Sequence, residues 1–150
     1  MIRRAHADDL EGLMALERRC FGPHEGLFQR RQIRRLLASA TAAWFVYGDY
    51  WGACCMLIGA NGRARWGRLY SLAVDPAHRE KGIGRALVLA GLDWLAAHHI
   101  DQCRAEVKAG NEPARRLYAS LGFVEAGGLP HYYGIGGHGL RLAKTLRGAP

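Results

Sequence analysis

Apolar and polar residues alternate along this chain with two different periods. Apolar positions three and four residues apart predict helices from Asp8, as the N-cap, through Leu16, and over about 27–39, 82–98 and 111–122. Segments in which apolar and polar residues alternate, or which are rich in aromatic and β-branched residues, predict strands over 2–5, 41–48, 50–59, 66–74, 102–107, 123–128 and 139–146. This order, with alternating strands and helices in its second half, predicts a mixed α/β (α+β) fold.

The composition narrows the class of protein. Hydrophobic residues make up 49% of the chain and charged residues 23%, which is typical of a globular protein and excludes a disordered or fibrous one. The length of 150 residues predicts a single domain over 1–150. No apolar run approaches the roughly 18 to 20 residues that span a bilayer, and the first residues contain no apolar signal segment. We therefore expect a cytoplasmic protein without a membrane partner.

The four cysteines show no metal-ligand spacing. Cys20, Cys54, Cys55 and Cys103 form neither a CxxC pair nor a Cys/His cluster, so we expect reduced thiols in the core and no metal site. Because successive side chains of a strand point to opposite faces, Cys54 and Cys55 should lie on different sides of a sheet.

The formal net charge of +8 favours an anionic ligand, a nucleic acid or an acidic surface. One side of the second predicted helix carries Arg30, Arg31, Arg34 and Arg35. These arginines form a solvated face, or they attract an acidic peptide or a nucleoprotein surface. Single-strand recognition combines basic and aromatic residues. Phe28 is the only aromatic residue near these arginines, which makes nucleic acid an unfavoured partner.

The segment HREKGIGRAL, residues 78–87, combines cations with two glycines at the start of a predicted helix. The first turn of a helix leaves four backbone N–H groups unpaired, and glycine lets an anion approach them. A plain turn into a helix is the alternative. The pattern lacks the Gly-Lys-Ser/Thr of a P-loop, and Leu87 stands where a dinucleotide fingerprint has glycine or alanine.

Two linked motifs resemble the GNAT N-acetyltransferase superfamily. REKGIG, residues 79–84, matches its [RQ]-x-x-G-x-[GA] signature, and NEPARRLYASLGF, residues 111–123, is similar to its N-x-x-A-x-x-L-Y-x-x-x-G-F block. The resemblance implies acetyl-CoA as cosubstrate and a mixed, mostly antiparallel sheet of six to seven strands flanked by about four helices. Within the superfamily the chain is similar to ribosomal-protein alanine N-acetyltransferases. GIGGHGLRL, residues 134–142, lacks the acidic pair of that group.

The resemblance also implies how acetyl-CoA is bound. The pyrophosphate site it implies consists of Arg79, Glu80, Lys81, Gly82, Ile83, Gly84 and Arg85. The backbone of Leu72, Ala73 and Val74 would polarise the thioester carbonyl, if a bulge leaves its N–H groups free. Asn111 would cap its own helix, bind the cosubstrate, or do both.

Catalytic roles follow for two residues. Glu106, directly or through a water, would accept the proton of the amine. The alternative interpretation of Glu106 is that it is a solvated residue of its strand without a catalytic role. Tyr118 would protonate the leaving thiolate, and its alternative is a core tyrosine on the apolar stripe of its helix. Tyr132 and Tyr133 would either wall the acceptor pocket or pack a hairpin.

The sequence thus predicts an acetyl-CoA-dependent N-acetyltransferase that transfers acetyl directly to a primary amine, with a protein N-terminal α-amino group as the leading acceptor. A small-molecule amine, such as a polyamine, an amino acid or an antibiotic, is the first alternative. A non-catalytic module that binds acyl-CoA or nucleic acid is the second.

Overall fold

A seven-stranded sheet forms the centre of the molecule in the computed structural model, which describes residues 1–21 and 30–146. The predicted turn at 22–26 and the first residues of the second predicted helix, 27–29, lie outside this range. The strands lie in the order β1, β2, β3, β4, β5, β7, β6. Their bounds are β1 (Ile2–Arg4), β2 (Ala42–Tyr47), β3 (Gly52–Asn61), β4 (Ala64–Val74), β5 (Gln102–Lys108), β6 (Val124–Leu129) and β7 (Gly139–Thr145).

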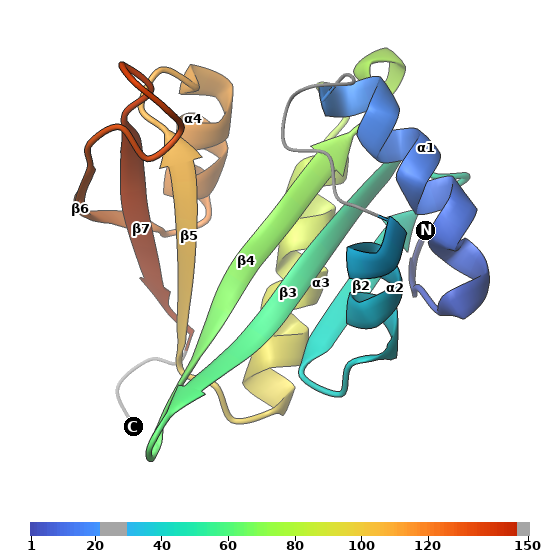
Figure 1. The fold of residues 1–150 in the computed structure, drawn as a ribbon, viewed down its shortest axis with the longest axis horizontal. Coiled ribbons are helices and arrows are strands. Elements are labelled where there is room, and N and C mark those ends of the chain that lie inside the picture. Colours follow the sequence, from blue (N-terminus) through green and yellow to red (C-terminus); the bar gives the residue numbers. More distant parts are fainter. Residues whose placement is uncertain (22–29, 147–150) are drawn as a thin grey trace.

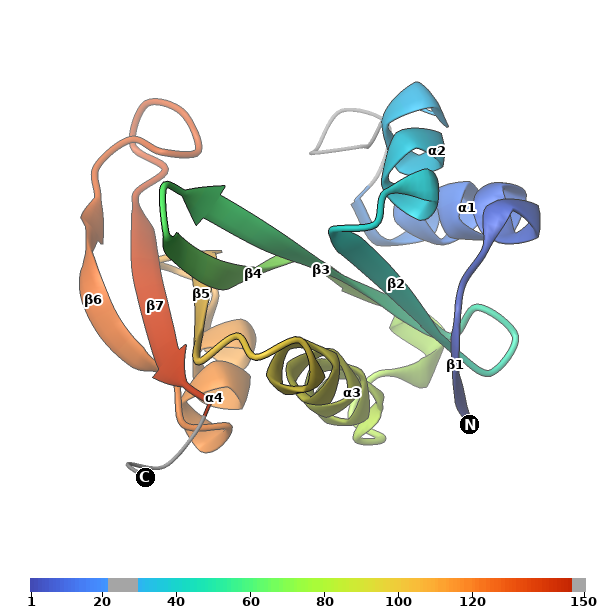
Figure 2. The ribbon, with the colours of Figure 1, turned by 90° about the horizontal axis from the view of Figure 1, so that it is seen from below.

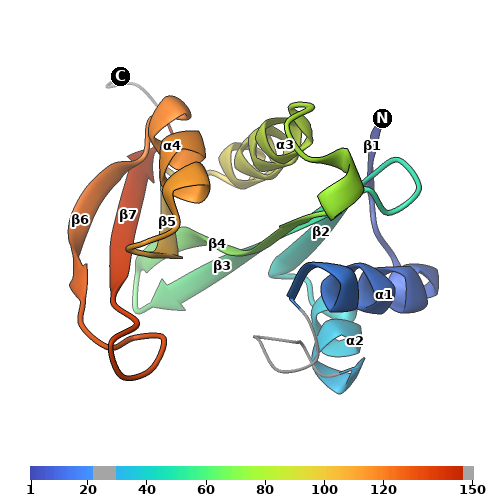
Figure 3. The same cartoon turned by 90° about the horizontal axis from the view of Figure 1, so that it is seen from above.

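Helices cover both faces of this sheet. The described residues contain α1 (Leu10–Phe21), α2 (Arg30–Ala38), α3 (Ile83–Ala97) and α4 (Glu112–Ser120), with 3-10 turns at Ala7–Asp9 and Pro76–His78. Figures 2 and 3 show α1 and α2 on one face and α3 and α4 on the other. Every neighbouring strand pair is antiparallel except β4 and β5, which are parallel. The predicted mixed, mostly antiparallel sheet is confirmed.

Three local predictions are wrong. Asp8 is not the N-cap: a 3-10 turn precedes α1, its N-cap is His6, and Asp9 at its third position accepts the backbone N–H of His6 at 2.9 Å, while Asp8 is exposed. The turn expected over 60–65 shrinks to Gly62 and Arg63, since β3 and β4 pair up to Asn61 and Ala64. The apolar pattern of the helix predicted over 82–98 includes Leu89 and Leu92 as an extension of its buried surface, but only Leu92 is buried, whereas Leu89 is 43% exposed.

Two hydrophobic cores lie on the two faces of the sheet. Because strand residues alternate, Cys54 joins the core beneath α3, and its neighbour Cys55 joins the core beneath α1 and α2. All four cysteines are free thiols, and three of them are buried. The predictions of reduced thiols and of opposite faces for Cys54 and Cys55 are confirmed.

The central parallel pair of strands, β4 and β5, separates partway along its length. Pairing between them covers only Gly67 to Leu69 on β4 and Cys103 to Ala105 on β5. Beyond these residues the strands diverge, which Figure 1 shows as a V between β4 and β5. The edge of β4 that faces β5 is therefore not paired with β5 past Leu69.

The described residues include no helix that is both long and apolar enough to cross a membrane.

Candidate active site

The opening between β4 and β5 begins at a bulge in β4. Cys55 pairs with Ser71 and Met56 pairs with Leu69, so Tyr70 is an extra residue in β4. The sequence prediction placed a bulge around 72–74; it lies just before them. Leu72, Ala73 and Val74 follow the bulge on the part of β4 that β5 does not pair with, where backbone N–H groups can meet a ligand.

The N-terminus of α3 lies after this end of β4 in the chain. Gly82 caps the helix with φ +78°, and the first intrahelical bond runs from Ala86 N to Gly82 O at 3.1 Å. The N–H groups of residues 82–85 precede that bond and remain as the free donors of the first turn. Glu80 also has a positive φ of 63°, so the loop backbone bends into a concave run of N–H groups suited to an anion.

The residues of the predicted anion site differ in how accessible they are. A Cβ atom built on Gly82 would meet nothing within 4 Å, so this position is open to a ligand. Gly84 instead lies against neighbouring side chains, where a Cβ would come within 3.4 Å of Leu117. Ile83 is buried in the core and can offer only its backbone. Lys81 is exposed, so its ammonium is available to a phosphate.

Arg79 of the loop and Arg85 of the first turn of α3 each donate a hydrogen bond within the protein. Arg79 Nε donates to Val74 O at 3.1 Å, and Arg85 Nη1 donates to Ser120 Oγ at 3.1 Å, which joins α3 to α4. Asn111 caps α4, because its Oδ1 accepts the N–H of Ala114 at 3.2 Å. The capping prediction is confirmed, while its contact with the cosubstrate stays a prediction.

Glu106 lies at the other arm of the opening. It is the first residue of β5 beyond the paired segment, and its carboxylate lies 2.8 Å from the guanidinium of Arg68 on β4. Its side chain is only 15% exposed, so the alternative of a solvated strand residue is wrong. Arg68 also stacks over the ring of Tyr70, with 5.3 Å to the ring centroid. The ion pair therefore fixes Glu106 where the two strands separate.

Tyr118 approaches from the opposite face of the sheet. Its ring belongs to the core beneath α3 and lies 5.6 Å from that of Phe123. Burial raises the pKa of the Tyr118 phenol, and the nearby Cys54 and Tyr133 raise it further. A phenol in this state stays protonated at neutral pH, so the core position and the role of a proton donor are compatible.

Tyr132 and Tyr133 belong to the β6–β7 loop, which lies on the same side of the sheet as α1 and α2 (Figures 2 and 3). Their rings meet edge to face at 4.9 Å, and the ammonium of Lys108 lies 5.7 Å from the ring centroid of Tyr133. Burial raises the pKa of Tyr133, with smaller contributions from Tyr132 and Glu106. The loop thus brings Tyr133 near Glu106.

The sequence interpretation missed Glu17 on α1. Its side chain is buried, and Ser71 Oγ donates to its Oε1 at 3.3 Å. Burial raises the pKa of Glu17 to about 7, and the bond from Ser71 lowers it only in part. One signal could have revealed it, because Glu17 occupies a position on the apolar stripe of α1, between Leu13 and Cys20.

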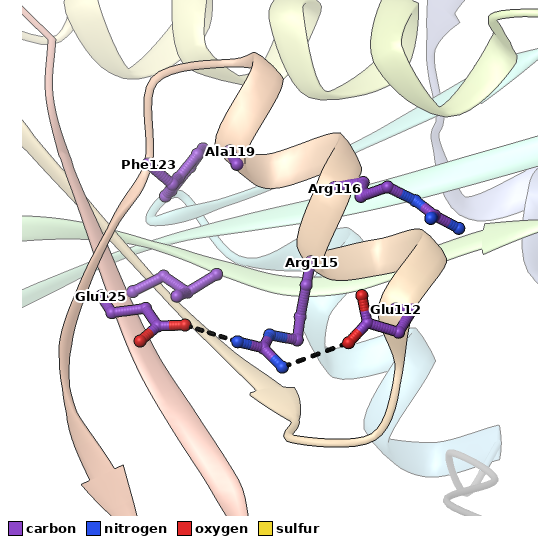
Figure 4. A pocket seen from close by; sticks show the side chains of 7 residues that line it. Glu112, Arg115, Arg116, Ala119, Phe123 and Glu125 are labelled. Atoms are coloured by element: carbon purple, nitrogen blue, oxygen red, sulfur yellow. Dashed lines mark hydrogen bonds and ion pairs between the residues drawn. The ribbon is translucent and has the colours of Figure 1, made fainter.

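Two hollows lie close to α4. One of about 390 Å³, at the end of β5, is lined by Lys108, Asn111 and His138 with Ala109, Gly110, Gly136 and Gly137. Figure 4 shows the other, of about 230 Å³, where Arg115 bridges Glu112 and Glu125; Arg116, Ala119, Phe123 and Leu142 complete its lining. Neither of these two hollows is lined by Glu106 or Tyr118.

Comparisons with known proteins agree with this geometry. Residues 10–123 match the sequence profile of the acetyltransferase (GNAT) family. A mycothiol acetyltransferase of Acidimicrobium ferrooxidans is 34% identical over 117 residues, which cover 77% of this chain and 33% of the relative. The mycothiol acetyltransferase of Thermobispora bispora is 34% identical over 129 residues, which cover 77% of this chain and 43% of that relative. The chain thus spans less than half the length of these relatives.

Solved structures show the same fold. The ribosomal-protein-S18-alanine N-acetyltransferase of Escherichia coli superposes with a TM-score of 0.82 at 24% identity, over 100% of this chain and 96% of the other. NAA60 of Arabidopsis thaliana, solved with acetyl-CoA, gives 0.83 at 18% identity, over 99% of both chains. The predicted enzyme class and its cosubstrate acetyl-CoA are confirmed at the level of the family. Since the profile covers most of the sequence and the fold agrees throughout, this chain belongs to the acetyltransferase (GNAT) family.

Proposed function

We propose that this chain transfers the acetyl group of acetyl-CoA directly to a primary amine, with a protein N-terminal α-amino group as the acceptor. One observation carries the proposal: Glu106, oriented by Arg68, lies where β4 and β5 separate. Tyr118, a proton donor, is buried on the opposite side of the sheet. A base and an acid on the two sides of one opening suit a reaction that takes a proton from one reactant and returns one to another.

The residues present fit acetyl-CoA. The open position at Gly82 and the free N–H groups of residues 82–85 suit a pyrophosphate, with Lys81 as the accessible cation. Over Leu72, Ala73 and Val74 the edge of β4 away from β3 is not paired with β5, so the N–H groups that point to this edge can bind an extended chain or a carbonyl. Bound there, acetyl-CoA would supply an activated acetyl group.

Glu106 and Tyr118 can move the protons that the transfer requires. An α-amino group has a reference pKa of about 7.7 to 8.0, so a carboxylate, alone or through a water, suffices to take its proton. The nitrogen forms its bond to the acetyl carbon as the carbon–sulfur bond breaks. Tyr118 donates its phenolic proton to the departing thiolate and regains a proton, through water, from the nitrogen as the amide forms. Glu106 releases to solvent the proton that it accepted from the ammonium.

The acceptor side favours an extended chain behind the amine. Tyr132, Tyr133 and Ile135 of the β6–β7 loop are 48%, 39% and 101% exposed, and the loop lies on the side of α1 and α2. Exposed apolar side chains beside an amine site offer contacts that a peptide can use and a minimal amine cannot.

A small-molecule amine is the second candidate acceptor. The relatives that are 34% identical bear the name mycothiol acetyltransferase, which denotes a small-molecule substrate. This observation favours a metabolite acceptor for part of the family, and a direct comparison of acceptors separates the two candidates.

The test is a thiol-release assay with acetyl-CoA and a panel of acceptors: peptides with free N-termini, amino acids, polyamines and aminoglycosides. We expect peptides to give the highest kcat/KM, and Glu106→Gln to lower kcat by about tenfold or more with acetyl-CoA affinity unchanged. Glu125→Gln, an exposed carboxylate paired with Arg115, is the matched control. Higher kcat/KM for small amines would establish the second candidate. Acetyl-CoA binding without turnover on any acceptor would refute the catalytic proposal.

A further inference from the structure

Glu17 is a buried carboxyl group with half of its hydrogen-bonding capacity unused. Its residue is 2% exposed, Oε1 accepts the hydroxyl of Ser71, and Oε2 has no hydrogen-bond partner within the described ranges 1–21 and 30–146. A buried acceptor without a partner is costly in a folded protein. Such a group calls for a partner that binds from outside.

The position of Glu17 relates it to the opening between the strands. Ser71 follows the bulged residue Tyr70 and stands two residues past Leu69, the last residue of β4 that pairs with β5. Arg68 contacts the Tyr70 ring on one side and Glu106 on the other, which places these three side chains on one face of the sheet. Tyr70 accepts a hydrogen bond from Gln32 of α2, so this is the face that α1 and α2 cover.

Glu17 and Glu106 therefore lie on the same face, one above each arm of the opening. Glu106 already has a cationic partner in Arg68, whereas the groups known to interact with Glu17 are neutral. They are Ser71 on β4, the thiol of Cys55 on β3 and the thiol of Cys20 on its own helix. Burial raises the pKa of both thiols, so neither balances a carboxylate charge nor competes with it.

A glutamine at this position would fit the same space in the fold. It has the same volume, its amide oxygen could accept the Ser71 hydroxyl, and it would not ionise. What glutamate alone provides is a negative charge, which is strongest where water is excluded and which a cation entering the site would stabilise. A primary amine reaches the enzyme mainly as an ammonium ion, because its pKa lies near or above neutral pH.

We propose that Glu17 binds the ammonium group of the acceptor through its unpartnered oxygen, while Ser71 holds the carboxylate in place. The inference rests on the proposed function and adds to it the residue that selects cationic acceptors. Glu17 transfers no proton in the reaction. The ammonium proton passes to Glu106, the neutral amine forms the bond to the acetyl carbon, and the second proton of the nitrogen restores the phenol of Tyr118 after that phenol has protonated the thiolate.

The experiment compares Glu17→Gln with the wild type, using the acceptor that has the highest kcat/KM in the panel. We expect the KM of that acceptor to rise about tenfold or more, with the affinity for acetyl-CoA unchanged. The analogue of this acceptor in which hydrogen replaces the amine should bind both proteins equally. Glu11→Gln removes the same charge from an exposed position of α1 and should leave all three quantities unchanged.

The pH dependence and a second variant complete the test. In the wild type, kcat/KM should contain an ionisation near pH 7 that Glu17→Gln lacks, because the pKa of Glu17 is raised to about 7. Ser71→Ala leaves the carboxylate but frees it to move, so it should raise the acceptor KM by a smaller factor.

Two outcomes would overturn the inference, and they are distinct. If wild type and Glu17→Gln acetylate amines with the same KM and pH profile, Glu17 is only structural and the proposed function stands. If the wild type acetylates no amine, the proposed function fails and this inference falls with it.

Discussion

Tyr118 shows how one side chain can serve both the core and the chemistry. Its position on the apolar stripe of α4 allowed two interpretations, a core residue or a catalytic acid. The structure places the ring in the core. The same burial that packs the ring raises the pKa of its phenol, which preserves the proton that an acid must donate.

Tyr118→Phe should retain the fold and lose the proton donor. We expect kcat to fall by about tenfold or more while acetyl-CoA affinity and thermal stability change little, because only the hydroxyl is removed. Steady-state thiol release and calorimetry measure these quantities, and Tyr47→Phe, a half-buried tyrosine elsewhere in the core, is the control. Unchanged kcat would remove Tyr118 from the acid role.

Glu17 makes the stability of the protein depend on pH. Its pKa is about 7 when folded and 4.5 as an ordinary carboxyl, so the folded state binds more protons between these values and unfolding free energy falls as pH rises through them. Glu17→Gln should therefore be more stable than wild type by on the order of 3 kcal/mol at about pH 8, with little difference below about pH 4.5. Denaturant unfolding at both pH values measures this. An equal difference at the two values would contradict it.

At the scale of elements, the start of α3 and the cap of α4 followed from sequence. Glycine before an apolar stripe and Asn111 before Pro113 are local signals, since a cap and its helix lie within a few residues. The cap predicted at Asp8 is wrong, because a 3-10 turn with His6 as its N-cap precedes α1. Asp9 in that turn also binds Arg3 and Tyr50, contacts that no local pattern contains.

Gly82→Ala tests the anion site at α3. Its φ of +78° disfavours alanine, which should lower the unfolding free energy by about 1 kcal/mol. The new methyl group would occupy the open space above the free N–H groups and should weaken CoA binding by about fivefold or more. Gly62→Ala, with φ +62° and equally open surroundings, should lower stability alike and leave CoA affinity unchanged. Equal CoA affinities of both variants would place the pyrophosphate elsewhere.

At the scale of the whole molecule, the net charge of +8 includes a group of arginines on α2. Arg31, Arg34 and Arg35 are exposed on α2, on the side of the sheet that carries Glu17 and Glu106, whereas Arg30 pairs with Glu11. The predicted arginine face is thus a surface feature beside the proposed acceptor site, where long-range attraction can act on an approaching peptide.

Replacing Arg31, Arg34 and Arg35 together by glutamine should lower kcat/KM severalfold for peptides with acidic residues after the first position, and leave neutral peptides unaffected. The effect should shrink as salt rises from about 0.05 to 0.5 M, because exposed charges are screened. Replacing Arg63 and Arg65 in the β3–β4 hairpin is the control. A parallel loss for neutral peptides would show that the arginines act on the fold instead.

The sequence by itself determined the elements, the family motifs and the residues that could carry the chemistry, because periodicity, caps and the glycine pattern depend on neighbours within a few positions. The tertiary structure alone decided which of these residues meet. Strand register and helix placement determine three features: the point at which β4 and β5 separate, the pairing of Glu106 with Arg68, and the burial of Glu17 against Ser71, which is 54 residues away in the chain. Contacts of this kind depend on how distant segments pack, and no local pattern encodes them.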